Sequence, residues 1–371
     1  MTTLFEPLPL GAITLPNRII MAPMTRARGT QHHVPTPIMA DYYAQRATAG
    51  LIISEAIGIS QQGLGWAYAT GIWSAEQIAG WRLITDAVHA AGGRIIAQLW
   101  HMGRVVHPSF LDGAQPIAPS VTTAPGLAHT YAGKQPYSQA RALPLEEIPS
   151  LIAEFAQAGR NALLAGFDGV QIHAANGYLI DQFLRDSGNF RTDAYGGSVE
   201  NRVRLLREVT QAVAHVVGAD RTGVRLTPSS HDQGVRDSDP VPLFTRAAEV
   251  LSEIGIAHLE LREPPADGSF GVSEYPPSAA IIRESFKGTL ILNSDYDSAR
   301  AEAALATGLA DAVAFGRPFI ANPQLPEVLR RGLPLAQEDR STWFSQGVEG
   351  YTDYPGLRSG QVATQSTLTR A

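Results

Sequence analysis

The segment His-Ala-Ala-Asn-Gly-Tyr, at residues 173–178, brings together side chains that could do chemistry at the end of an apolar run. His173 and Asn176 lie three positions apart, and Gly177 permits a sharp turn before Tyr178. Two neutral hydrogen-bond donors could hold a developing oxyanion. The phenol has an ordinary pKa of about 10, so it is protonated at neutral pH and could supply a proton. The same histidine and asparagine could instead satisfy loop backbone groups, and spacing alone leaves both interpretations open.

Arg225 stands inside another apolar run, between Val224 and Leu226. A buried cation is costly unless an anion meets it. The anion could be a carboxylate of the same protein, such as Glu55 or Glu260, or it could belong to a ligand. Both possibilities stay open at this point.

A phosphate site is predicted near the end of the chain. Gly316 and Arg317 follow one apolar run, and Ser294 and Asp295 end the run before it. In a (β/α)₈ barrel the loops after strands seven and eight usually bind phosphate. Glycine allows the backbone to approach the ligand, and arginine pairs with phosphate in a fork. The alternative is an ordinary turn that starts a helix.

Other polar and aromatic residues are weaker candidates. Gln98, in a buried run, needs partners for its amide, and Thr25 follows the first apolar run with a free hydroxyl. Satisfaction within the core explains either residue as well as a ligand does. Aromatic residues that could form pocket walls, although aromatics are more often core, are Trp66, Tyr68, Trp343 and Phe344.

Eight short apolar runs, most followed by a helical pattern, predict an α/β fold. Near-continuous Val, Ile and Leu is typical of strands buried on both faces. The expected strands are 18–24, 51–59, 94–100, 169–175, 222–228, 257–263, 289–295 and 312–318. Helical periodicity and caps predict helices over about 75–91, 146–165, 199–217 and 241–254.

These elements predict a (β/α)₈ TIM barrel, with residues 1–371 as a single domain. An open nucleotide-binding sheet would usually carry GxGxxG after its first strand, and this chain has none. The candidate polar residues also follow many different strands, as barrel active sites do.

Three segments depart from the repeat. Residues 4–17 are expected to form a hairpin that plugs the bottom of the barrel, with Gly11 in its turn. Residues 102–142, rich in Gly, Pro, Ser and Ala, are expected to form a lid or pocket wall. Residues 356–371 read as a loose polar tail.

Composition excludes several classes of function. A net charge of −6 gives no basic field for nucleic acid. The absence of cysteine excludes disulfides, thiolate metal sites and iron–sulfur clusters, and we expect no metal. No targeting signal or apolar stretch of membrane-spanning length is apparent, so we expect a cytoplasmic protein without a membrane partner.

The sequence resembles the Old Yellow Enzyme family of FMN-dependent ene-reductases. The most specific stretch is HAANGYLIDQFLRDSGNFRTDAYGGSVENR at 173–202, joined by QLWHMGR at 98–104. The similarity extends from NRIIMAPMTR at 17–26 to GYTDYP at 350–355. Some relatives carry cysteine where Thr25 stands, so the chain resembles the classical branch of the family.

The resemblance implies a noncovalent FMN at the C-terminal mouth of the barrel. Arg225 would lie near N1 and C2=O of the ring, and Gly316 with Arg317 would hold the phosphate. The other implied FMN contacts are Pro23, Met24, Thr25, Ala56, Gln98, Ser294 and Asp295. The chain departs from the family pattern where some members have glycine at Ala56, tyrosine at Phe344 or a glycine-containing turn at 293–296.

The resemblance also implies a mechanism with two halves. NADPH or NADH would reduce the flavin at N5, and an electron-poor alkene would then take its place. His173 and Asn176 would polarise the aldehyde, ketone or nitro oxygen, hydride would pass to the β-carbon, and Tyr178 would protonate the α-carbon. The implied substrate walls are Trp66, Tyr68, Trp100, Phe270, Trp343, Phe344 and the 102–142 segment. The enzyme would act as a monomer or a homodimer.

Four other functions are alternatives to this one. The nearest is a flavin reductase that acts on nitro compounds, nitrate esters or quinones. A dienoyl-CoA-reductase-like flavoprotein would need cysteines and a further domain. A lyase or isomerase for phosphate substrates would need a base, and Glu55 and Glu260 are available, but none of the eight expected strands contains a lysine. A non-catalytic ligand-binding barrel would not need His173, Asn176 and Tyr178.

Overall fold

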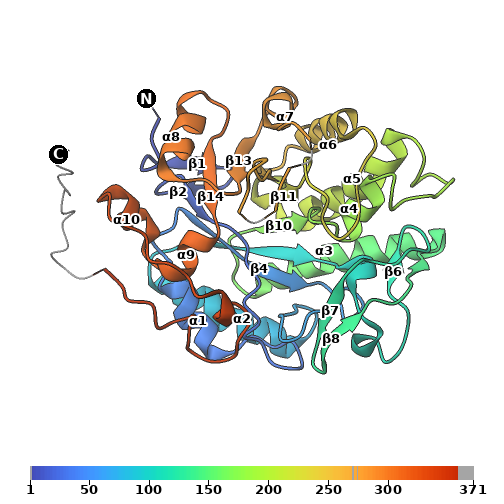
Figure 1. Cartoon of the computed structure of the whole chain (residues 1–371), viewed down its shortest axis with the longest axis horizontal. Helices are drawn as coiled ribbons and strands as arrows, with labels where there is room; N and C mark the ends of the chain where they lie inside the picture. Colours follow the sequence, from blue (N-terminus) through green and yellow to red (C-terminus); the bar gives the residue numbers. More distant parts are fainter. Residues whose placement is uncertain (1, 270, 274, 358–371) are drawn as a thin grey trace, which may run out of the picture.

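The computed structural model describes residues 2–269, 271–273 and 275–357. Eight parallel strands form a closed barrel in the order β10-β11-β12-β13-β14-β3-β4-β5, with helices around it (Figure 1). The strands are β3 (Ile19–Met21), β4 (Leu51–Gly58), β5 (Ile95–Trp100), β10 (Val170–His173), β11 (Thr222–Leu226), β12 (His258–Arg262), β13 (Thr289–Asn293) and β14 (Ala312–Phe315). Each lies within one of the eight expected runs, which confirms the (β/α)₈ fold.

Helices lie between the barrel strands along the chain, as expected. They are α1 (Pro37–Ala44), α2 (Ala75–Ala90), α3 (Ile148–Leu164), α4 (Leu179–Leu184), α5 (Val199–Val217), α6 (Pro240–Ile254), α7 (Ala279–Ser285), α8 (Ser298–Ala306), α9 (Arg317–Ala321) and α10 (Leu325–Arg330). Ser74 caps α2, because its side chain accepts from the backbone N–H of Gln77 while the Gln77 side chain accepts from that of Ser74. The capping predicted at this helix is therefore confirmed.

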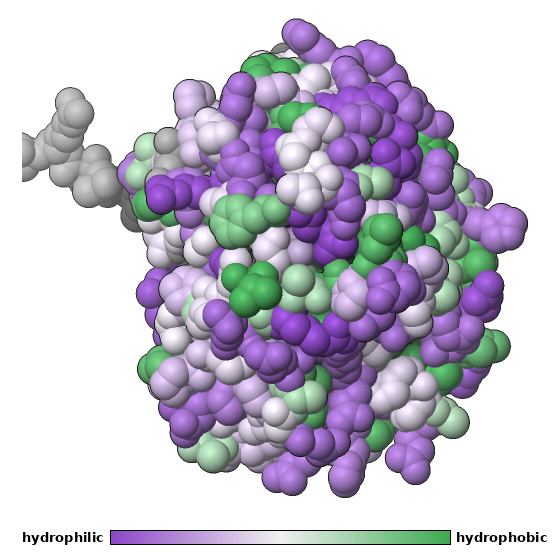
Figure 2. Space-filling view, turned by 90° about the vertical axis from the view of Figure 1, so that its right-hand side faces the viewer, coloured by the Kyte–Doolittle hydropathy of each residue, from purple (hydrophilic) through white to green (hydrophobic). Residues whose placement is uncertain are grey.

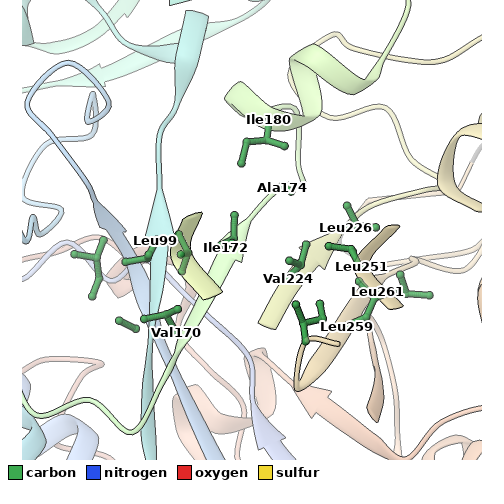
Figure 3. Packing of buried hydrophobic residues seen from close by; sticks show 14 of the residues in the cluster. Leu99, Val170, Ile172, Ala174, Ile180, Val224, Leu226, Leu251, Leu259 and Leu261 are labelled. Carbon is green, nitrogen blue, oxygen red and sulfur yellow. The ribbon is translucent and has the colours of Figure 1, made fainter. Parts of the chain in front are cut away.

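Successive residues of the barrel strands face two different regions, the hydrophobic core outside the barrel and the barrel interior. Ile172, Val224 and Leu259 are paired across β10, β11 and β12 and belong to the hydrophobic core cluster shown in Figure 3. Because successive strand residues point to opposite faces, Arg225 and Glu260, which are paired with each other, face the barrel interior. The outer face thus builds the core, and the inner face is free to carry polar groups.

The N-terminal hairpin closes one end of the barrel. Strands β1 (Leu8–Leu10) and β2 (Ile13–Leu15) pair antiparallel, and their buried residues form one cluster with barrel residues such as Ile53 and Ile291. Gly11 has a φ of 56°, and a Cβ there would lie 1.9 Å from the backbone oxygen of Asp220. Only glycine fits that turn. The expected plug is confirmed.

Residues 102–142 fold into short, paired strands. Strands β7 (Leu127–Thr130) and β8 (Gly133–Pro136) form a hairpin, and β6 (Ile117–Ala118) pairs with β9 (Arg141–Ala142). The His129 ring stacks on Trp66 with centroids 4.3 Å apart. The excursion therefore reaches the C-terminal mouth of the barrel through a packed contact.

Buried arginines tie the C-terminal segment to the barrel. Figure 1 shows this segment, in red, running past α1. Arg26 donates to the carbonyl oxygen of Gly350 at 2.7 Å, and Arg28 donates to those of Thr342 and Trp343 at 3.1 and 3.0 Å. The Tyr42 and Tyr351 rings stack 4.0 Å apart. These contacts fix the position of Trp343 and its neighbours.

The expected tail begins within the described chain and continues beyond it. The backbone N–H of Leu357 donates to Gln324 Oε1 at 2.8 Å. Residues 358–371 lie outside the described residues.

The described helices include none that is long and apolar enough to cross a membrane. On the face seen in Figure 2, hydrophobic residues lie in small separate groups among hydrophilic ones.

The turn after β10 positions the predicted catalytic segment. Asn176 and Gly177 both have positive φ, 58° and 74°. Asparagine is among the few non-glycine residues that adopt this conformation readily. The backbone N–H of Gly177 donates to Asp181 Oδ2 at 2.8 Å, and a Cβ on Gly177 would lie 2.3 Å from the backbone oxygen of Asp232. The sharp turn predicted before Tyr178 is confirmed.

We predict that Gly177→Ala lowers the free energy of unfolding much more than Gly197→Ala does. Gly197 has a similar φ of 79°, but a Cβ there would meet no atom within 4 Å. Gly197→Ala should cost roughly 1–2 kcal/mol, the cost of placing a Cβ in this conformation. Gly177→Ala should cost at least about 1 kcal/mol more, because its Cβ also collides with the backbone of Asp232 and the Cβ of Gln233. Urea denaturation measures both, and equal losses would contradict this account of the turn.

Candidate functional site

A cavity of about 760 Å³ opens at the C-terminal ends of the barrel strands. Its volume is that of a site for a cofactor or a drug-sized ligand. It gathers candidates from the ends of β3, β4, β5, β10, β11, β13 and β14, or the loops that follow them, and from the C-terminal segment. The predicted residues that line it are Pro23, Met24, Thr25, Trp66, Trp100, Asn176, Tyr178, Arg225, Ser294, Asp295, Gly316, Arg317, Trp343 and Phe344.

Four predicted residues of the described chain, Ala56, Tyr68, Gln98 and His173, are not among the residues that line this cavity. The His173 ring is 5.0 Å from the Tyr178 ring, and Ala56 pairs with Gln98 in the β4–β5 ladder. Tyr68 packs edge-on against Tyr131, with ring centroids 5.0 Å apart, and is not among the lining residues of the described chain. Phe270 lies outside the described residues.

The Asn176 side chain is oriented by residues of the two neighbouring strand ends. Its Oδ1 accepts from Thr227 Oγ1 at 2.9 Å and from Arg262 Nη1 at 3.4 Å. Because the protein holds the oxygen, the amide Nδ2 is left as the donor for the cavity that Asn176 lines.

His173 is a neutral donor at neutral pH. Its burial, with smaller contributions from the positive charges of Arg225 and Arg262, holds its pKa well below the ordinary value. A neutral imidazole has one N–H donor and one acceptor nitrogen. Nδ1 is buried and has no hydrogen-bond partner among the described residues. A buried polar atom in this state requires an explanation, and a bound ligand would supply one.

Tyr178 is held between two rings. It lies edge-on to Trp100 and to His173, with both centroids 5.0 Å away. Burial raises the pKa of the phenol, with smaller contributions from Tyr137 and Asp232, so the hydroxyl keeps its proton at neutral pH. The residue therefore presents a protonated phenol at the cavity beside two neutral donors.

Arg225 has the intramolecular carboxylate partner that one interpretation predicted, and its place at the cavity leaves the ligand interpretation open. It forms an ion pair with Glu260, Nε to Oε1 at 2.9 Å, and it also lines the cavity. Glu55, the other carboxylate considered, lies instead beside Tyr43, whose hydroxyl is 3.4 Å from Glu55 Oε1. Burial raises the pKa of Glu55 to about 7.

The predicted phosphate region has an unusual backbone. Ser294 and Asp295 have φ values of 108° and 48°, so both adopt the conformation that favours glycine. Consecutive N–H groups in such conformations can form a concave anion site. The Asp295 carboxylate pairs with Arg317 and accepts from the Ser269 hydroxyl at 2.9 Å. Any contact of Asp295 with an anion would thus be made by its backbone.

Arg262 and Thr227 were not among the site residues predicted from the sequence. Arg262 ends β12, lines the cavity and pairs with Asp232 at 2.8 Å. The signal that marked Arg225, an arginine in an apolar strand, would have found it. Thr227 has no distinguishing sequence signal, because its role depends on which strand lies beside β10.

Comparisons with known proteins identify the family. A family model described as NADH:flavin oxidoreductase / NADH oxidase matches residues 3–336. A chanoclavine-I aldehyde reductase of Penicillium roqueforti is 46% identical over 376 residues, covering 99% of this chain and 100% of that protein. A 12-oxophytodienoate reductase of Oryza sativa is 41% identical, covering 98% of this chain and 96% of that protein.

Solved structures agree with these matches. An Old Yellow Enzyme homologue of Zymomonas mobilis has a TM-score of 0.95 and 57% identity, covering 96% of this chain and 100% of its own. Morphinone reductase in complex with tetrahydroNAD has a TM-score of 0.92 and 47% identity, covering 98% of this chain and 100% of its own. The barrel, the cavity at its mouth and these similarities lead to one conclusion: the chain belongs to the Old Yellow Enzyme family of flavin oxidoreductases.

Proposed function

We propose that this chain is an FMN enzyme that uses NADPH or NADH to reduce electron-poor C=C bonds. Its substrates would be α,β-unsaturated aldehydes and ketones and nitroalkenes. The observation that carries the proposal is that Asn176 and the protonated phenol of Tyr178 line the cavity with Arg225, while neutral His173 packs against Tyr178.

The residues at the cavity fit a noncovalently bound FMN. Arg225 supplies buried N–H donors beneath one part of the cavity, and Arg317 with the 294–295 backbone supplies donors suited to a phosphate at another. The unpartnered buried Nδ1 of His173 is consistent with a ligand close to the donors. When bound, FMN would accept hydride from the nicotinamide and deliver it to the alkene.

His173 and Asn176 would bind the carbonyl or nitro oxygen of the substrate. Negative charge grows on that oxygen as the β-carbon is reduced, so donors already in place stabilise the transition state. Thr227 and Arg262 keep the Asn176 amide in the donating orientation. Removal of one such donor typically costs about 3 kcal/mol of transition-state stabilisation.

Tyr178 would give its proton to the α-carbon. Its raised pKa keeps the proton available across the neutral range, and the packed Trp100 and His173 rings hold the phenol in one place. The substrate would lie among aromatic walls, since Trp66 and Phe344 line the same cavity with ring centroids 5.3 Å apart. We also propose that the 102–142 segment supports this wall through the stacking of His129 on Trp66.

The relatives support the choice of reaction class. Two of them are named as reductases of an aldehyde and of an oxophytodienoate, and the similar morphinone reductase structure contains tetrahydroNAD. These names support activated alkenes as substrates and a nicotinamide as reductant.

The function is tested by anaerobic turnover of the purified, FMN-loaded protein. We expect oxidation of NADPH or NADH that depends on a cyclic enone or a nitroalkene and yields the saturated product. Cyclohexene, which lacks an activating group, is the matched control and should not react. Nicotinamide oxidation that occurs only with oxygen, without alkene reduction, would exclude this function.

The oxyanion role is tested by the double variant His173→Ala, Asn176→Ala. Phenolic ligands should bind the wild type through their oxygen. Two hydrogen bonds to an anionic oxygen contribute about 1.5–3 kcal/mol each, so we expect binding at least roughly 100-fold weaker in the variant. The measurement is a titration followed by flavin absorbance. Unchanged binding would refute the assignment.

The proton-donor role is tested by Tyr178→Phe. General acid catalysis contributes about 10²–10⁴-fold, so alkene reduction should slow by at least about 100-fold, while reduction of the flavin by nicotinamide is unchanged. Stopped-flow absorbance separates the two half-reactions. Tyr137→Phe is the control, because that phenol packs in the same apolar cluster as Tyr178. Equal slowing of both half-reactions in Tyr178→Phe would contradict the role.

A further inference from the structure

A continuous chain of hydrogen bonds crosses the barrel interior at its mouth. Gln98 Nε2 donates to Gln171 Oε1 at 2.7 Å, and Gln171 Nε2 donates to Glu260 Oε2 at 2.8 Å. Arg225 Nε donates to the other carboxylate oxygen, Oε1, at 2.9 Å. Arg225 Nη2 then donates to Asn293 Oδ1 at 2.8 Å. Glu260, 0% exposed, stands at the centre of the chain.

Glu260 dictates the direction of every bond on its Gln98 side. An ionised carboxylate only accepts hydrogen bonds, so the Gln171 amide must turn its NH₂ towards Glu260. The Gln171 oxygen then faces Gln98 and requires an N–H from it. The reversed arrangement would place two acceptors, Gln171 Oε1 and Glu260 Oε2, against each other without a proton. Gln98 therefore points its own oxygen away from Gln171.

The position of His258 is compatible with this orientation of the Gln171 amide. Its Nε2 lies 3.2 Å from Gln171 Nε2, and burial lowers the pKa of His258 to about 4. The neutral imidazole can accept from the second N–H of Gln171. Both amide hydrogens of Gln171 thus have acceptors.

Glu260 also balances the charge of Arg225. The two side chains are 6% and 0% exposed, and little water screens them. The strand register fixes the pair, because Arg225 and Glu260 are direct partners in the β11–β12 ladder. A negative charge on a ligand at this end of the cavity is attracted by the Arg225 guanidinium and repelled by the Glu260 carboxylate behind it.

We propose that Glu260 is a positioning residue that lowers the reduction potential of FMN bound at this mouth and orients Gln98 and Arg225 towards it. The inference rests on the proposed flavin function. Two-electron reduction at neutral pH adds two electrons and one proton to FMN, so the ring gains a negative charge. The Glu260 carboxylate opposes that charge, whereas Arg225 alone would favour it.

The test is the midpoint potential of FMN bound to Glu260→Gln, measured anaerobically with dithionite and a reference dye. We expect the oxidised-to-reduced equilibrium to shift at least tenfold towards reduced flavin, equivalent to a rise of about 30 mV for a two-electron couple. Asp237→Asn is the matched control. Asp237 is also buried and paired with an arginine, Arg202, but it does not line the cavity, so its variant should keep the wild-type potential.

The orienting role is tested by Gln171→Met, which keeps the ion pair and removes the link to Gln98. FMN should bind this variant at least about tenfold more weakly, since one buried hydrogen-bonded partner is lost. Unchanged affinity would overturn the orienting role.

The outcomes separate this inference from the function on which it rests. A wild-type protein that takes up no FMN would refute the proposed function. FMN uptake with an unshifted or lowered potential in Glu260→Gln would refute only the role of Glu260. If Glu260→Gln does not fold, Glu260→Asp withdraws the carboxylate from Arg225 and should raise the potential by a smaller amount. A wild-type potential in that variant would also overturn the inference.

Discussion

The ion pair between Arg225 and Glu260, buried inside the barrel mouth, is the interaction on which the rest of the site depends. Burying either charge alone would cost about 3–5 kcal/mol, so the structure must keep both, in register, on adjacent strands. From this pair, hydrogen bonds run to Gln171 on one side and Asn293 on the other. The pair therefore positions polar groups on several of the eight strands.

The same charges shape the catalytic end of the cavity. Arg225 and Arg262 help burial to keep His173 neutral. A neutral histidine donates one hydrogen bond without bringing a counter-ion into the cavity, and the Asn176 amide, held by Thr227, provides a second neutral donor. Charge that develops on a substrate oxygen would thus meet dipoles already in place, with positive charges behind them.

Much of the fold could be predicted because both faces of each barrel strand are buried and the runs are nearly continuous in apolar residues. His173, Asn176 and Tyr178 could be predicted as a group because they lie within six residues at the end of one strand. The partners that orient them could not, since Thr227 and Arg262 reach Asn176 only through strand pairing. Tyr68 stays a predicted wall residue, and its edge-on contact with Tyr131 could not be predicted because it joins two distant segments of the chain.

We propose that the barrel mouth holds FMN through Arg225 at the ring and Arg317 at the phosphate. The most direct test is a titration of the purified apoprotein with FMN and with riboflavin, followed by flavin fluorescence. We expect one FMN per chain and riboflavin binding at least about 100-fold weaker, because riboflavin lacks the phosphate that Arg317 and the 294–295 backbone would hold. A protein that binds no FMN, or that binds both flavins equally, would refute this mode of binding.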